Sequence, residues 1–211
     1  MWRSFRAALA RFAVRRAAAC QGHAPRRAVR WLRLACGLSP TFAEPYPALV
    51  ALCRTLEDRF GALAAGQEAA VRFPGNPDAW MLLGDAYLMV FKQKEALHAY
   101  EQVLALEERA DAAMAAGQLY RRAGQPAEAA ARFARAYAAG GGASALWENA
   151  QALSQAGDHH AADDALALWA TQVPDGMEKL AEARARLRSG EAGGREGEEG
   201  SEEASDPGAR G

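Results

Sequence analysis

The chain has 211 residues, a length typical of one domain with short additions, and half of its residues are hydrophobic. Aromatic residues make up only 8%. Alanine, the best helix former, supplies much of the apolar content, which argues against a β-sandwich or barrel. No stretch approaches the roughly 18–20 uninterrupted apolar residues of a membrane span, so no transmembrane segment is expected.

The formal net charge of −1 conceals a strongly uneven distribution along the chain. Residues 1–43 contain nine arginines and no aspartate or glutamate, whereas residues 190–211 contain seven acidic residues and two arginines. The chain therefore has a basic start, a mildly acidic body and an acidic end, a pattern that can guide interactions with other molecules.

The first twenty residues resemble several targeting signals only in part. Arg15 and Arg16 interrupt the apolar core that a secretory or lipoprotein signal ending at Cys20 would need. An arginine-rich, acid-free, amphipathic segment also fits a mitochondrial presequence, and the apolar residues on its common helical face are Trp2, Phe5, Leu9 and Phe12. The alternative is an ordinary basic helix of the fold, which the repeat described below favours. We expect a cytoplasmic protein, with a mitochondrial location as the alternative.

An internal repeat of about 33 residues is the most informative signal. Gly84 and Gly117 are one repeat apart, and so are the turn glycines Gly124 and Gly157. Two further columns keep the same step, namely Ala96, Ala129 and Ala162, and then Tyr100, Phe133 and Leu166. Three units in one register predict three copies of one supersecondary unit stacked on each other.

These residues resemble the tetratricopeptide repeat family over Asn76 to Asp175. The first unit offers Trp80, Leu83, Gly84, Tyr87, Ala96 and Tyr100. The second offers Gly117, Tyr120, Gly124, Ala129, Phe133 and Ala136. The third departs from the pattern through Ala150, Leu153 and Trp169, and is closed by Pro174. The resemblance implies an all-α, right-handed α-solenoid of stacked antiparallel helix pairs. Small residues are expected to meet where the helices cross: Gly84 with Ala96, Gly117 with Ala129, and Ala150 with Ala162.

The same register extends upstream and downstream of the three clear units. Pro40 precedes Pro74 by one repeat, and Pro174 follows Pro74 after three repeats, with a residue added at some of these steps. We therefore expect basic N-terminal helices forming a degenerate repeat over residues 1–42, a second degenerate repeat over 43–76, three repeats over 77–174 and a capping helix over 175–189. Residues 190–211 have no apolar side chain larger than alanine or proline, and we expect them to form a disordered acidic tail.

In the family that this chain resembles, the first helices line a concave groove that holds extended or helical peptides of partner proteins. By register, the candidate groove residues are Met81, Asp85, Leu88, Met89, Met114, Gln118, Arg121, Arg122, Trp147, Gln151 and Gln155. One subclass clamps a partner's terminal carboxylates with lysine and asparagine. Here the corresponding places hold Asp85, Gln118 and Gln151, so an amphipathic partner segment is favoured instead. The alternative for some of these residues is a place in the core between helices.

Catalytic, cofactor and metal motifs are not evident. The cluster Gly140–Gly142 lacks the lysine and Ser/Thr that follow a phosphate-binding loop. His159 and His160, with Asp163 and Asp164, form a weak metal-binding pattern that a polar helix start explains better.

Cys20, Cys36 and Cys53 form no Cys-x-x-Cys and are expected to be reduced and mostly buried. We expect a non-enzymatic adaptor or scaffold without a cofactor. The alternative is a helical protein that associates with nucleic acid or an anionic membrane surface through its arginine-rich N-terminus.

Overall fold

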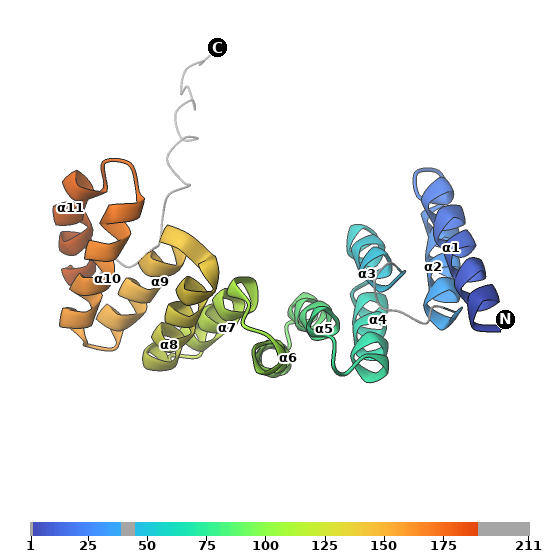
Figure 1. Ribbon diagram of the computed structural model, residues 1–211, viewed down its shortest axis with the longest axis horizontal. Coiled ribbons are helices and arrows are strands. Elements are labelled where there is room, and N and C mark those ends of the chain that lie inside the picture. Colours follow the sequence, from blue (N-terminus) through green and yellow to red (C-terminus); the bar gives the residue numbers. More distant parts are fainter. Residues whose placement is uncertain (1, 39–44, 190–211) are drawn as a thin grey trace, which may run out of the picture.

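The computed structural model describes residues 2–38 and 45–189, and this part of the chain is almost entirely helical (Figure 1). Its helices are α1 Trp2–Cys20, α2 Pro25–Leu38, α3 Pro45–Thr55, α4 Arg59–Arg72, α5 Pro77–Met89, α6 Gln93–Leu106, α7 Ala110–Arg122, α8 Pro126–Ala136, α9 Gly142–Gln155, α10 His159–Gln172 and α11 Gly176–Arg188, with a π-helical turn η1 at Tyr137–Gly141. Pro40 and the acidic residues 190–211, on which two of the expectations rest, lie outside the described residues.

Consecutive helices pack as pairs, and each pair also packs on the next. The pairs are α1–α2, α3–α4, α5–α6, α7–α8 and α9–α10, and α11 packs on α10 at the far end. Figure 1 shows these pairs following one another in a row from the N-terminus to α11. The expected all-α solenoid is therefore confirmed. Among the described helices, none combines the length and the apolar character needed to cross a bilayer.

Helix starts are determined by short-range sequence signals. Asn76 caps α5 by accepting a hydrogen bond from the backbone N–H of Asp78 at 2.9 Å, and Pro77 follows at the first position, where its missing N–H costs nothing. Asp58 and Asp158 cap α4 and α10 by accepting from backbone N–H groups three residues further along, at 2.8 and 3.1 Å. Such caps satisfy N–H groups that have no partner within the helix.

The turn inside each of four successive helix pairs places one residue in the left-handed region of backbone space. These residues are Glu57, Phe91, Gly124 and Gly157, with φ of 57, 60, 73 and 86°. Their spacing along the chain follows the repeat, although only the last two are glycine. In the sequence, only Gly124 and Gly157 indicated this repeated turn. The backbone conformation shows that the same turn also occurs in α5–α6 and α3–α4.

Large aromatic side chains fill the helix crossings, which differs from the expected contact between small residues. A Cβ placed on Gly84 would lie 2.6 Å from Cε1 of Tyr100, and one placed on Gly117 would lie 2.6 Å from Cε1 of Phe133. The nearest atoms are thus not those of Ala96 and Ala129, although both alanines are fully buried. The reason is that helical side chains lean toward the N-terminus of their helix, so a ring reaches the crossing from one turn further along.

The N-terminal segment forms part of the array. Ala10, Ala13 and Ala17 of α1 are at most 5% exposed, and Arg6 donates a hydrogen bond from its guanidinium to the backbone oxygen of Gly37 at 3.0 Å. Further links run between α2, α3 and α4, because Arg72 donates to the backbone oxygen of Cys36 and to the Tyr46 hydroxyl. This segment is therefore an arginine-rich helix that packs within the fold.

Candidate functional site

The candidate groove residues all lie on the first helices of three successive pairs. We call the surface that they form the first-helix face. Its residues are Met81, Asp85, Leu88 and Met89 of α5, Met114, Gln118, Arg121 and Arg122 of α7, and Trp147, Gln151 and Gln155 of α9. Residues three or four positions apart on a helix share a side, so each helix presents its members together.

A column of large apolar side chains crosses the first-helix face. Met81, Met114 and Trp147 follow one another at intervals of one repeat, and each is half-buried. The two methionines pack against the core between α6 and α7, and Trp147 packs against the core formed with α10 and α11. Every member of this column therefore contributes to the core and still presents atoms at the surface.

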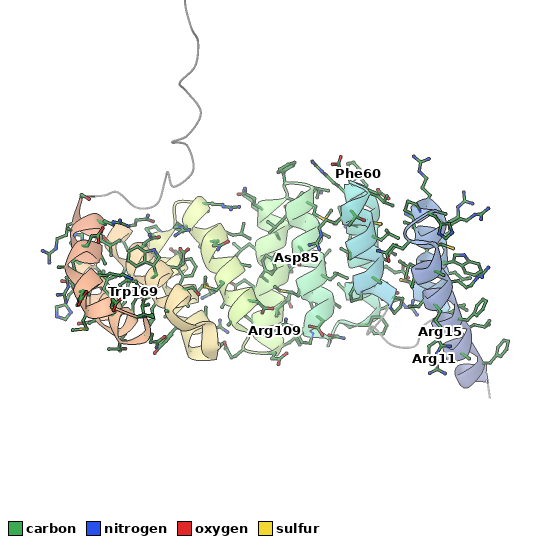
Figure 2. All side chains as sticks on the ribbon, turned by 90° about the horizontal axis from the view of Figure 1, so that it is seen from above. Arg11, Arg15, Phe60, Asp85, Arg109 and Trp169 are labelled. Atoms are coloured by element: carbon green, nitrogen blue, oxygen red, sulfur yellow. The ribbon has the colours of Figure 1, made fainter. Side chains whose placement is uncertain are left out.

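The polar column beside it begins with Asp85, which is exposed and lies near the middle of the array (Figure 2). The hydroxyl of Tyr100, in α6, donates a hydrogen bond to Oδ1 of Asp85 at 2.7 Å. Burial, followed by the charge of Asp85, raises the pKa of Tyr100 far above its ordinary value. The hydroxyl thus stays protonated and fixes the carboxylate as an acceptor.

Arg121 connects α7 to α9 on the first-helix face. Its guanidinium donates to the Glu148 carboxylate and to Oε1 of Gln151, the latter at 3.1 Å, and lies 5.7 Å from the ring centroid of Phe133. Gln151 is only 8% exposed. Gln151 therefore orients Arg121 and offers little surface of its own, whereas Arg122 and Gln155 are exposed.

One edge of this face carries a charge network that the sequence reasoning missed. Arg109, which is labelled in Figure 2, lies in the turn before α7. Its guanidinium donates to Asp78 of α5 and to Asp111 of α7. The hydrogen bond from Arg109 holds the pKa of Asp111 below its ordinary value. The spacing of one repeat between Asp78 and Asp111 was the signal that could have revealed the pair. The network links two successive first helices at their N-terminal ends.

Trp169 is a second residue that the sequence reasoning left out of the site. Its ring centroid lies 5.3 Å from that of Trp147, with the two ring planes tilted by 47°. By repeat register, Trp169 occupies the place of Val103 and Ala136, both fully buried. A tryptophan in a column of small side chains was the available signal.

The histidine cluster does not form a metal centre. Nδ1 of His160 lies 3.2 Å from Oδ2 of Asp164, with both side chains exposed, whereas Asp163 pairs with Arg184 and Arg188 of α11. No group of three potential metal ligands occurs within residues 2–38 and 45–189. The three cysteines carry free thiols, two of them buried.

The opposite end of the array is basic and partly apolar. Figure 2 shows Arg11 and Arg15 on α1, far from Trp169. Phe12 of α1 packs edge-on against Trp31 of α2, with ring centroids 6.1 Å apart, and remains 53% exposed. The guanidinium of Arg16 lies 5.9 Å from the ring of Trp31.

The geometry defines a helical-repeat protein in which side-chain hydrogen bonds link the successive first helices α5, α7 and α9. No family model and no curated protein matches the sequence. The fold is nevertheless similar to that of solved structures. MamA is 18% identical with a TM-score of 0.65, covering 82% of this chain and 94% of that one. YrrB, described as a tetratricopeptide repeat protein with an unusual peptide-binding site, is 18% identical with a TM-score of 0.61, covering 84% and 90%.

A tetratricopeptide repeat protein from Parabacteroides merdae is 17% identical with a TM-score of 0.63, covering 85% of this chain and 72% of that one. The chain has the tetratricopeptide repeat fold.

Proposed function

We propose that this protein is a non-enzymatic interaction scaffold that binds an amphipathic segment of a partner protein on its first-helix face. The observation that carries the proposal is the column of Met81, Met114 and Trp147, which recurs once in each of the pairs α5–α6, α7–α8 and α9–α10 beside polar groups. The similar fold of YrrB, whose description names a peptide-binding site, supports the same class of function.

The chemistry of the face suits a segment with apolar and polar sides. Methionine adapts its shape to different partners, and tryptophan offers a large contact area at little cost in conformational entropy. Asp85 and Arg121 are already held by Tyr100 and by Glu148, so less ordering is needed when a partner binds. Binding in the micromolar range, about −8 kcal/mol, is expected of such a surface.

The test is an affinity pull-down with mass spectrometry, using the full chain at low and high salt. Arg122→Glu changes an exposed charge on the first-helix face, and Lys94→Glu makes the same change on the second helix of a pair. We expect the parent protein to capture a partner at both salt concentrations. Arg122→Glu should abolish this capture, and Lys94→Glu should leave it unchanged. A partner retained equally by both variants would place the binding surface elsewhere.

A second candidate function rests on the N-terminal end. Residues 1–43 carry nine arginines without a single acid, and α1 exposes Phe5 and Phe12 beside them. Arginines interleaved with aromatic rings suit nucleic acid or an anionic membrane surface. Binding of this kind falls steeply with salt. Capture that is lost at high salt and with Arg11→Glu plus Arg15→Glu, but kept with Arg122→Glu, would favour this second function.

A further inference from the structure

The contact between α11 and the preceding helices differs from the earlier junctions before α5, α7 and α9. In those three helices, two small or apolar positions pack on the pair before, and both are at most 4% exposed. These positions are Ala79, Ala112 and Ala145, and then Ala86, Leu119 and Ala152. The corresponding positions of α11 follow Ala145 and Ala152 by one residue more than the earlier repeat step. These positions hold Lys179 and Arg186. Both charged side chains are exposed, and α11 packs on the preceding helices through Leu180, Ala183 and Leu187 instead.

A pocket of about 510 Å³ lies at this altered junction. Its lining includes Ser144 and Trp147 of α9, Trp169 of α10, and Lys179, Glu182 and Arg186 of α11. Trp169 is itself a departure from the repeat, so α10 and α11 both contribute residues that depart from its small-residue columns. The pocket is open to solvent, and its volume falls in the range of ligand-binding clefts.

The lining combines an aromatic pair with an excess of positive charge. The two indoles provide an apolar aromatic surface, with their centroids 5.3 Å apart and their ring planes tilted by 47°. Glu182 is paired with Arg186 at 2.9 Å, whereas Lys179 donates only a long hydrogen bond of 3.4 Å to the backbone oxygen of Pro174. Lys179 and Arg186 against the single carboxylate of Glu182 leave a net charge of about +1 on the lining at neutral pH.

We propose that this pocket binds an aromatic side chain of the partner segment, with aspartate or glutamate residues as its neighbours in sequence. The inference rests on the proposed function, since Trp147 belongs both to the first-helix face and to the pocket. The ring would pack against Trp147 and Trp169, and the flanking carboxylates would accept hydrogen bonds from Lys179 and Arg186. The chain's own acidic residues 190–211 include no aromatic side chain and lack the group that the indoles require.

The test measures the affinity of the full chain for three short synthetic peptides by fluorescence anisotropy. One peptide has a central phenylalanine flanked by glutamates, the second has lysines in place of the glutamates, and the third has alanine in place of the phenylalanine. We expect the first to bind at least about tenfold more tightly than the other two. The variant Trp169→Ala should lose this advantage.

The decisive variant carries both Lys179→Glu and Arg186→Glu, which reverses the charge of the pocket. We expect it to prefer the lysine-flanked peptide, while a control with Arg26→Glu and Arg30→Glu, exposed residues of α2, keeps the original preference. Circular dichroism melting verifies that each variant is folded. Equal affinity for all three peptides, no saturable binding, or an unchanged preference after charge reversal would overturn the pocket assignment. The proposed binding function of the first-helix face would still stand if the parent protein captures a partner and Arg122→Glu does not.

Discussion

The ring of Phe133 lies directly against the backbone of Gly117, at a distance that leaves no room for a side chain. Tyr100 and Gly84 repeat this relationship one unit earlier, with the same 2.6 Å between a placed Cβ and Cε1 of the ring. In the pairs α5–α6 and α7–α8, the helices can therefore approach as closely as they do because the first helix has glycine at the crossing. The crossing also directs the Tyr100 hydroxyl to Asp85, so the packing of the core positions a group on the first-helix face.

Replacing this glycine tests the crossing directly. Gly117→Leu forces the ring of Phe133 or the whole helix to move, and we expect the free energy of unfolding to fall by ~1–3 kcal/mol. Urea denaturation and the melting midpoint measure the loss. Gly75→Leu is the matched control, because a Cβ at Gly75 meets no atom within 4 Å. An unchanged midpoint for Gly117→Leu would contradict the assigned register.

Phe91 has a backbone conformation that favours glycine. Its φ of 60° places it in the left-handed region, where the equivalent turns hold Gly124 and Gly157. We expect Phe91→Gly to raise the free energy of unfolding by about 0.5–1 kcal/mol, because the steric cost of a Cβ in this region is removed. The neighbouring Val90→Gly, at φ −102°, should instead lower it. A loss of stability in both variants would show that the contact of Phe91 with Arg59 outweighs the strain.

Trp147 is expected to contribute much of the binding energy on the first-helix face. Trp147→Ala should weaken partner binding by at least about tenfold, or ~1.4 kcal/mol, without unfolding the protein. Isothermal titration calorimetry with the captured partner measures the change. Leu168→Ala removes an exposed apolar side chain from α10 and should leave the affinity as it is. Equal affinity of Trp147→Ala and the parent protein would remove Trp147 from the site.

Alkaline pH should weaken the N-terminal core through Cys36. Burial, with the negative charge of Glu68, raises the pKa of the Cys36 thiol from 9.0 to about 12. Because the folded pKa lies above the unfolded one, this contribution to stability is complete below pH 9 and is lost as pH rises toward 12. We expect the fall in unfolding free energy over this pH range to be smaller in Cys36→Ala by about 1 kcal/mol or more.

Denaturation curves at several pH values above 9 measure this slope. Val50→Ala, in the same core cluster, removes a buried apolar side chain without removing a titratable group. It should lower stability at every pH and keep the slope of the parent protein. A slope in Cys36→Ala that matches the parent would show that other groups cause the alkaline loss.

Much of the architecture could be predicted from local signals in the sequence. The repeated columns of Gly84 and Gly117, and of Tyr100 and Phe133, indicated helix pairs because each unit must bury the same face against its neighbour. Proline and aspartate at helix starts are signals of the same local kind, since capping depends on residues only two or three positions apart. The first-helix face followed from the same register.

Which partner each side chain meets could not be predicted in this way. Gln151 fits the groove column by spacing, yet it is buried beneath Arg121, and the ring of Phe133, rather than Ala129, covers Gly117. The periodicity of the sequence predicts that a position is buried, but not which atoms contact it. Those contacts depend on side-chain direction and on the angle at which helices cross, and both are set by long-range packing. For the same reason, Trp169 and Lys179 were separate irregularities in the sequence. The tertiary structure alone brings them together around one pocket.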